Sequence, residues 1–207
     1  MKNKPHAPAT ERNAAAILDV LRVELGEAGS VLEIGSGTGQ HAVTFAAALD
    51  HLTWQTSDRD ENLDGINAWV ADSGLDNVLQ PLSLDVLRVE TLPDHYDAVF
   101  SANTAHIMSS AAVTKMFALV AAALDEAGRF CLYGPFREGG EFNTASNAEF
   151  HRSLRQQDPD MGIRHLEDLD RYAKAGSMQR LRQYAMPANN LLVVWQKVKK
   201  GAANGDT

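Results

Sequence analysis

The stretch that most constrains the fold of this chain is residues 31–39, with the sequence VLEIGSGTG. An apolar run containing one acidic residue leads into glycines at alternate positions, Gly35, Gly37 and Gly39. Glycine adopts positive φ angles readily, and a ligand can approach its main chain because it has no Cβ. The apolar segment from Val43 to Leu49 follows and indicates a helix whose first N–H groups point toward the loop. The sequence therefore predicts a strand, a tight turn and a helix, with a ligand over the turn.

The spacing of these glycines separates two classes of cofactor. A dinucleotide fingerprint has the pattern G-x-G-x-x-G/A, with the last small residue five positions after the first glycine. Here Gln40 occupies that position, the third glycine comes one place early at Gly39, and Glu33 stands two residues before Gly35. This pattern resembles motif I of the class I methyltransferases, which bind S-adenosylmethionine. A strand–helix turn that binds nothing is the alternative, because short glycine motifs also occur by chance.

The resemblance to motif I implies a cofactor site as well as a fold. The acidic residue and the glycine loop would hold the amino-acid end of S-adenosylmethionine, which is a zwitterion. The sheet would be doubly wound, with its third strand at an edge. The residues that the resemblance implies for this part of the site are Glu33, Gly35, Ser36, Gly37 and Gly39.

Length and charge narrow the class of protein further. The chain has 207 residues, and we expect one domain over residues 10–198 with flexible ends at 1–9 and 199–207. The formal net charge is −8 and the only dense basic run is residues 197–200, so nucleic acid is a disfavoured substrate. We find no apolar segment of the roughly 20 residues that span a bilayer, and no signal-peptide core. We therefore expect a cytoplasmic protein without membrane contact, and leave its oligomeric state open, with a homodimer as one option.

The chain contains a single cysteine, Cys131, within an apolar run. One cysteine excludes an internal disulfide and a multi-cysteine zinc or iron–sulfur site, so we predict no metal centre. It also excludes radical chemistry with S-adenosylmethionine, which requires a three-cysteine cluster. A cysteine-dependent pyrimidine methylase would need its thiol on a loop, whereas Cys131 lies in a predicted strand and is expected to be a small core residue.

Hydrophobic periodicity and turn residues place the other elements. Pro81 cannot donate a ladder hydrogen bond, which predicts an edge strand and agrees with the order that motif I implies. Thr10 is expected to cap the first helix, and residues 137–148 are expected to form an irregular lid or substrate wall. The predicted strands are 31–34, 52–57, 78–84, 96–103, 129–133, 181–185 and 191–198, and the predicted helices are 11–24, 40–49, 61–73, 110–124, 149–154 and 166–175.

These elements predict a single α/β domain. Its doubly wound, Rossmann-like sheet would have seven strands, mostly parallel, as in the class I methyltransferase fold that motif I implies. The last two strands alternate in polarity across the turn at 186–190, which predicts an antiparallel hairpin at the C-terminal end.

Acidic residues follow the second and third predicted strands, where a ligand crevice opens in sheets of this kind. Asp58 comes 23 positions after Gly35 (58 − 35), and an acidic residue at such a place can accept from both ribose hydroxyls of an adenosine. Asp60 and Glu61 are competitors that are better placed to cap the next helix. Asp85 ends the third strand and can accept from the adenine amino group or cap a turn.

Polar residues also follow the fourth strand, whose Y-D-x-V start is typical of class I methyltransferases. Asn103 and His106 lie just past its end, beside the expected position of the transferring methyl group. Asn103 is a candidate for both cofactor binding and catalysis. His106 can accept a substrate proton near neutral pH, or can be a hydrogen-bonded structural histidine. The Asp/Asn-Pro-Pro-aromatic motif that grips an amino nitrogen is absent here, which disfavours adenine and glutamine amides as acceptors.

The chain from about Thr10 to Val198 resembles an uncharacterised methyltransferase-like family, domain of unknown function 938. Two departures are local: Met161 stands where the family has an aromatic residue, and Thr56 where it has a proline. The resemblance implies a class I fold and S-adenosylmethionine binding, but no particular acceptor. The segments that carry it are 11–13, 35–41, 54–58, 103–107, 133–136, 146–147, 158–159, 162–164 and 186–190.

We hypothesise that polar residues from several of these segments converge around the methyl donor as substrate-binding or catalytic groups: Arg12, Asn13, His106, Tyr133, Asn189 and Asn190. Ordinary turn chemistry is the alternative for the two asparagines at 189 and 190. The leading interpretation is O- or N-methylation of a small molecule with S-adenosylmethionine. One alternative is a non-catalytic module that binds the cofactor or a partner. The other is an NAD(P)-dependent oxidoreductase, which is disfavoured because Gln40 occupies the last small position of the dinucleotide fingerprint.

Overall fold

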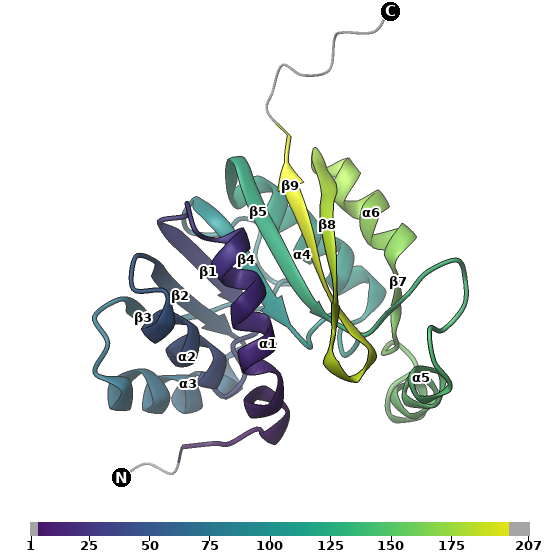
Figure 1. Cartoon of the computed structure of the whole chain (residues 1–207), viewed down its shortest axis with the longest axis horizontal. Helices are drawn as coiled ribbons and strands as arrows, with labels where there is room; N and C mark the ends of the chain where they lie inside the picture. Colours follow the sequence, from purple (N-terminus) through teal and green to yellow (C-terminus); the bar gives the residue numbers. More distant parts are fainter. Residues whose placement is uncertain (1–3, 199–207) are drawn as a thin grey trace, which may run out of the picture.

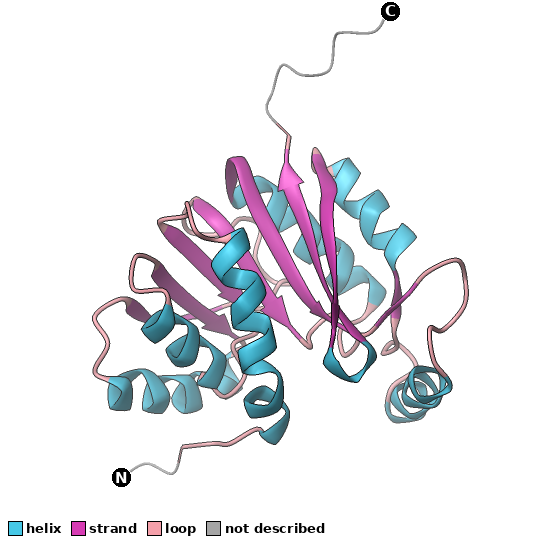
Figure 2. Cartoon of the chain, viewed as in Figure 1, coloured by secondary structure: helices cyan, strands magenta, loops and turns pink. Residues whose placement is uncertain are grey.

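The computed structural model describes residues 4–198, and its main sheet has seven strands. Six of them run parallel, and β9 is antiparallel to both of its neighbours, which confirms the predicted hairpin with β8. Figure 2 shows the sheet between helices on its two faces. The order across the sheet is β3 (Val78–Ser83), β2 (Thr53–Asp58), β1 (Ser30–Ile34), β4 (Tyr96–Ala102), β5 (Leu124–Gly134), β9 (Asn190–Lys197) and β8 (Met178–Met186).

The strand order fixes where a ligand can bind. From β1 the chain moves outward to β2 and β3, and it then returns to the other side of β1 as β4. This reversal leaves a crevice at the carboxyl ends of β1 and β4, which is the usual ligand position in open α/β sheets. β3 is an edge strand, as Pro81 predicted.

The helices form two layers around the sheet, and one helix stands apart (Figure 1). α1, α2 and α3 cover one face, and α4 and α6 cover the other. α5 lies at the lower right of Figure 1, at the same end of the molecule as the carboxyl ends of the parallel strands. The helices are α1 (Pro8–Glu24), α2 (Gln40–Ala48), α3 (Asp60–Ser73), α4 (Ser110–Ala123), α5 (Ala145–Gln157), α6 (Leu166–Ala175) and the 3-10 turn η1 (Pro187–Asn189), and β6 (Phe136–Arg137) pairs with β7 (Arg164–His165).

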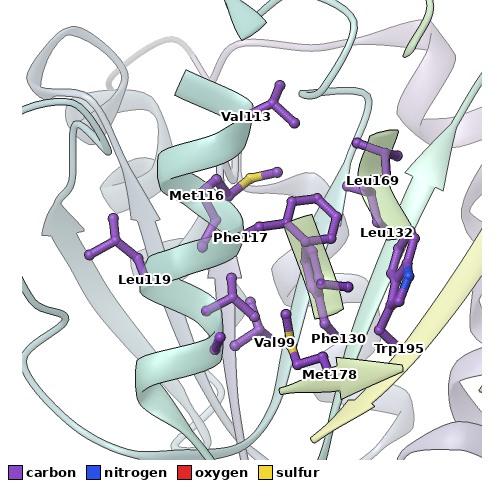
Figure 3. Packing of buried hydrophobic residues seen from close by; sticks show 14 of the residues in the cluster. Val99, Val113, Met116, Phe117, Leu119, Phe130, Leu132, Leu169, Met178 and Trp195 are labelled. Atoms are coloured by element: carbon purple, nitrogen blue, oxygen red, sulfur yellow. The ribbon is translucent and has the colours of Figure 1, made fainter. Parts of the chain in front are cut away.

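Aliphatic and aromatic side chains fill the core on the α4 side of the sheet (Figure 3). The ring of Phe117 lies edge-on to Phe130 and Trp195, with centroid distances of 5.1 and 5.2 Å. On the other face, Phe45 and Trp54 contact Phe100 in the same manner, at 5.6 and 5.9 Å. Edge-to-face contacts of this kind add to the stabilisation by area burial, so the strand ends that carry the site rest on a packed support.

A buried ion-pair network joins α1 to the far strands of the sheet. Glu24 is 3% exposed, and its Oε2 accepts from Arg129 Nη1 of β5 at 2.9 Å. Its Oε1 accepts from Arg182 Nη1 of β8 at 2.8 Å and from the Tyr184 hydroxyl. Two cations and a phenol therefore compensate this buried carboxylate, and the network holds α1 against β5 and β8.

Several element boundaries differ from the sequence prediction; β5, for example, begins at Leu124 and not at Arg129. α1 begins at Pro8 and not at Glu11, because proline at the start of a helix has its φ preset and needs no N–H partner. Thr10 is therefore inside the first turn and does not cap it, while the Ala7 N–H donates to Gln40 Oε1 at 2.6 Å. The helix expected at 149–154 is longer, since Thr144 Oγ1 caps it by accepting from the Asn147 N–H at 3.2 Å.

The ends of the chain are only partly described. Residues 1–3 and 199–207, where flexible ends were predicted, lie outside the described residues. Within the described residues, the Pro5 carbonyl accepts from Trp69 Nε1 of α3 at 2.8 Å. In the described part of the chain, no helix is both long and apolar enough to cross a membrane.

Candidate functional site

A cavity of about 1720 Å³ opens at the carboxyl ends of the parallel strands. Sites for one drug-sized ligand are usually about 300–1,000 Å³, so this cavity has room for a cofactor and a second molecule. Of the residues that the sequence predicted for the site, the cavity wall includes Arg12, Asn13, Gly35, Ser36, Gly37, Asp58, Asp85, Asn103, His106, Tyr133 and Asn190. Glu33, Gly39 and Asn189 are not on this wall.

The three glycines of the loop after β1 serve different purposes, although all have positive φ angles of 76°, 59° and 90°. A Cβ on Gly35 would lie 2.5 Å from Thr104 Cγ2, and one on Gly39 would lie 3.1 Å from the Ile66 Cα of α3. A Cβ on Gly37 would have no protein atom within 4 Å. Gly35 and Gly39 therefore permit close packing, whereas Gly37 leaves bare main chain facing the cavity.

Asp58 closes this cradle from the end of β2. Its side chain is largely buried, and its Oδ2 accepts from the Gly37 N–H at 2.7 Å. Its Oδ1 accepts from the Arg59 N–H at 2.7 Å and from Asn62 Nδ2 at 2.9 Å. These contacts fix the carboxylate on the cavity wall beside the glycine loop, where the sequence placed it.

Glu33 lies behind the loop and not on the cavity wall. It is 1% exposed, and its Oε2 accepts from Ser36 Oγ at 2.9 Å and from Trp54 Nε1 at 3.2 Å. The pKa of this carboxyl group is raised to about 7, chiefly by burial and also by the charge of Asp58, while the two hydrogen bonds oppose the rise. The sequence predicted a direct cofactor contact, but these hydrogen bonds hold the carboxylate inside the fold, where it supports the loop.

Asp85 lines the cavity, but its carboxylate has partners in its own turn. Oδ1 accepts from the Leu87 N–H at 3.0 Å, and Oδ2 lies 3.3 Å from Arg88 Nε. This is the turn-capping alternative that the sequence left open. Asp85 differs in this respect from Asp58, whose carboxylate accepts from the glycine loop across the strand ends.

The opposite end of the cavity begins with the residues after β4. Asn103 has a φ of 59°, and its N–H donates to the Tyr133 carbonyl at 2.9 Å. His106 is 8% exposed, and its ring lies edge-on to Phe150 of α5 at 5.4 Å. Burial, assisted by the charge of Arg164, lowers the pKa of His106 to about 4. The imidazole is therefore neutral at physiological pH, and neither ring nitrogen is hydrogen-bonded within the described part of the chain.

A second imidazole on the wall is held by the fold. His41 Nε2 is 2.8 Å from Asn13 Oδ1, and its ring stacks on Phe45 at 4.9 Å. Burial lowers the pKa of His41 to about 4. Asn190 Nδ2 donates to the Tyr133 hydroxyl at 3.1 Å, and hydrogen bonding from Asn13 and Asn190 opposes the effect of burial, which raises the pKa of that phenol. α1, α2, β5 and the hairpin turn thus share one polar network.

Asn189 is the one member of the predicted convergent group that does not face the cavity. It has a φ of 59°, and its carbonyl accepts from Asn143 Nδ2 at 3.3 Å and from Asn147 Nδ2 at 3.1 Å. Turn chemistry therefore accounts for this residue. Sequence reasoning did not single out His41, Phe150 or Asn147 as wall residues, although His41 and Asn147 lie in segments that carry the family resemblance.

The strand order and the site at the strand ends define the class I methyltransferase fold. A family model described as "Protein of unknown function (DUF938)" matches residues 4–197, and the chain belongs to this family. The match confirms the family that the sequence resembles.

Three solved structures with this fold come from larger methyltransferases. The mitomycin 7-O-methyltransferase MmcR aligns with a TM-score of 0.80 and 16% identity over 92% of this chain and 54% of its own. An O-methyltransferase family 2 protein from Planctomyces limnophilus, in complex with apigenin, aligns with a TM-score of 0.80 and 17% identity over 92% and 58%. The S-adenosylmethionine-dependent methyltransferase SibL aligns with a TM-score of 0.78 and 18% identity over 92% and 56%. The chain thus spans about half the length of these proteins, and the likeness concerns the fold.

Proposed function

We propose that this protein binds S-adenosylmethionine and methylates an oxygen or nitrogen atom of a small molecule. The observation that supports this most is the continuity of one cavity. Its wall runs from the bare main chain at Gly37 and the carboxylate of Asp58 to the neutral imidazole of His106. One end fits an adenosyl amino acid, and the other leaves room for an acceptor.

The residues of the first end fit the cofactor chemically. Gly37 has open space where a side chain would stand, so a ligand can contact the loop directly. Asp58 is placed at the end of β2, where a carboxylate can accept from ribose hydroxyls. Main-chain N–H groups at the start of α2 favour the carboxylate of an amino acid. Glu33 acts indirectly in this proposal, by holding Ser36.

S-adenosylmethionine supplies an already activated methyl group on a sulfonium sulfur. The protein must therefore position the acceptor and exclude water. The acceptor end is walled by apolar side chains that include Ile107, Phe150 and Met161, which suits a small molecule with an apolar body. A hydroxyl acceptor must also lose its proton.

His106 is the residue we assign to that proton. Its lowered pKa keeps the ring unprotonated at physiological pH, so a ring nitrogen is free to accept. His41 also lines the cavity, but its Nε2 is already engaged by Asn13 Oδ1. Of these two imidazoles on the wall, only His106 therefore has both ring nitrogens free to contact the small molecule that is methylated.

Calorimetry with S-adenosylmethionine, S-adenosylhomocysteine and NADH in parallel tests the cofactor. We expect submillimolar binding of the two adenosyl amino acids, and submillimolar binding of NADH alone would overturn the proposal. A mass-spectrometric screen with methyl-deuterated S-adenosylmethionine and a small-molecule library then tests turnover. His106→Gln is expected to slow transfer to a hydroxyl by on the order of 100-fold. Tight cofactor binding without transfer to any library member would favour the non-catalytic module.

A further inference from the structure

A second, smaller cavity of about 200 Å³ lies where α5, β6, β7 and α6 meet. Its wall includes five basic and imidazole residues: Arg137 of β6, His151 and Arg155 of α5, and Arg164 and His165 of β7. They come from three separate elements, so no local pattern in the sequence brings them together. Phe150 of the same helix lines the main cavity, and Met161 lines both cavities.

The three arginines of this cavity have no ion pair with a carboxylate of residues 4–198, in a chain whose net charge is −8. Asp168 also lines the cavity, but its Oδ1 accepts from Arg171 Nη2 at 2.7 Å. The arginines around Glu24, by contrast, face a carboxylate directly. The small cavity therefore gathers three arginines that form no ion pair among the described residues, whereas His165 Nδ1 lies 3.9 Å from Glu167 Oε2.

One donor in this group is buried without any partner. Arg137 Nε is inaccessible to solvent and makes no hydrogen bond to a described residue. Its guanidinium lies 5.0 Å from the centre of the Phe142 ring, which supports the cation but accepts no hydrogen bond in the guanidinium plane. The two Nη groups of Arg137 also make no hydrogen bond to a described residue, and unlike Nε they keep contact with solvent. An oxyanion in the cavity would therefore meet these Nη groups, and it is the chemical group that matches a guanidinium.

Hydrogen bonds to the main chain hold Arg164 and His151 in place on the wall of the small cavity. Arg164 Nε donates to the Ala105 carbonyl at 2.9 Å, and Nη2 donates to the carbonyls of Met108 and Asp160. The Ile163 N–H donates to His151 Nδ1 at 3.1 Å, so the proton of the neutral imidazole is on Nε2, a second donor. The loop that carries His106 is thus tied to the wall of the small cavity.

We propose that this cavity binds a small oxyanion, namely a carboxylate, phosphate or sulfate group held by Arg137 and Arg155. The anion is either free or the charged end of the methyl acceptor, and the second source rests on the proposed function. The volume suits one such group. Arg164 connects its occupancy to the His106 loop through the contacts to Ala105 and Met108.

Inorganic phosphate is the probe for the test, with sodium chloride at matched ionic strength as the salt control. We expect saturable binding of phosphate to the full chain by calorimetry, accompanied by a rise in Tm. Arg137→Gln and Arg155→Gln should each weaken it by about tenfold or more. Arg152→Gln, an exposed arginine of α5 on neither cavity wall, is the matched control and should bind as the wild type does.

Two results would overturn the proposal. One is an equal effect of phosphate and chloride on the wild type. The other is wild-type phosphate affinity in both Arg137→Gln and Arg155→Gln, with circular dichroism showing that each variant is folded. The use of two positions guards against a folding defect at Arg137, whose Nε is buried, since Arg155 is exposed.

Competition distinguishes the two sources of the anion. The probes are 4-hydroxybenzoate and its methyl ester, which differ in the carboxylate alone. Displacement of phosphate by the acid and not by the ester supports the charged end of a small molecule as ligand. Displacement by neither, with phosphate binding still dependent on Arg137, supports a free anion. Failure of the proposed function shows separately, as absent S-adenosylhomocysteine binding with phosphate binding intact.

Discussion

The cofactor end of the main cavity and the small cavity beside α5 are built from opposite kinds of group. Around Gly37 and Asp58 the wall consists of main-chain N–H groups and carboxylates that follow directly from strand ends. Around Arg137 and Arg164 it consists of guanidinium and imidazole groups from separate elements. The first end suits a zwitterionic ligand with hydroxyl groups, and the second suits an anion.

A third region, around Glu24, shows how the fold compensates a buried charge. Glu24 is as buried as Glu33, but two arginines and a tyrosine surround it. Glu33 has only hydroxyl and indole donors, and Arg137 has a buried donor with no acceptor among the described residues. A buried charge that the fold balances is structural, whereas one that it leaves unbalanced marks a candidate functional site. Each prediction below tests one side of this contrast.

The largest expected effect is a pH dependence of stability that Glu33→Gln removes. Burial raises the pKa of Glu33 from 4.5 to about 7, so between these values the folded state holds a proton that the unfolded state has lost. Relative to that of Glu33→Gln, the free energy of unfolding of the wild type should therefore fall by about 3 kcal/mol as pH rises from 4.5 to 7. Chemical denaturation of both proteins across this range measures it.

The quantity to measure is the difference in the free energy of unfolding between the wild type and Glu33→Gln at each pH. His41 and His106 have lowered pKa values of about 4, which give the opposite slope, because the unfolded state gains their protons as pH falls below 6.5. That contribution is common to both proteins and cancels in the difference. If this difference in the free energy of unfolding did not change with pH, the charge of the Glu33 carboxylate would be compensated in the fold, as that of Glu24 is.

Asp58→Ala should weaken S-adenosylmethionine binding by on the order of 1–3 kcal/mol, through the loss of charge-assisted hydrogen bonds. The effect is on binding because Asp58 lines the cavity at the end of β2. Calorimetry gives the change in Kd. Unchanged affinity in a folded variant would show that another residue holds the ribose.

The glycine loop offers a matched pair of substitutions. Gly35→Ala meets Thr104 Cγ2 at 2.5 Å, whereas Gly37→Ala meets no protein atom, and both residues have positive φ. Each should lose about 1 kcal/mol of stability from backbone strain, and Gly35→Ala about 1 kcal/mol more from overpacking. Gly37→Ala should instead lose the greater part of its cofactor affinity. If Gly35→Ala and Gly37→Ala changed stability and cofactor affinity equally, the assignment of Gly35 to packing and of Gly37 to ligand contact would be wrong.

The fold could be predicted well because its rules are local. Glycine spacing placed the β1–α2 turn, and Pro81 placed the edge strand, from residues within each segment. The start of α1 was wrong because Thr10 and Pro8 both suit a helix start, and the proline comes first. The position of Glu33 could not be deduced, because its partner Trp54 is on a neighbouring strand 21 residues away.

The site divides in the same way. Wall residues that end a strand, such as Asp58 and Asn103, follow from the parallel sheet itself. Asn189 was ambiguous because asparagine also tolerates the left-handed turn conformation that it adopts here. The small cavity had no sequence signal, since Arg137 and Arg164 meet only through the pairing of β6 with β7.

The smallest effect should come from Asp85→Ala. Its carboxylate accepts from the Leu87 N–H and faces Arg88 on the surface, so its removal should lower the free energy of unfolding by about 1 kcal/mol. Cofactor affinity should change by less than about threefold, because exposed charge pairs contribute little. Calorimetry beside Asp58→Ala gives the comparison. A tenfold loss would instead make Asp85 a direct ligand of the adenine, and the cofactor end would then use both strand-end carboxylates.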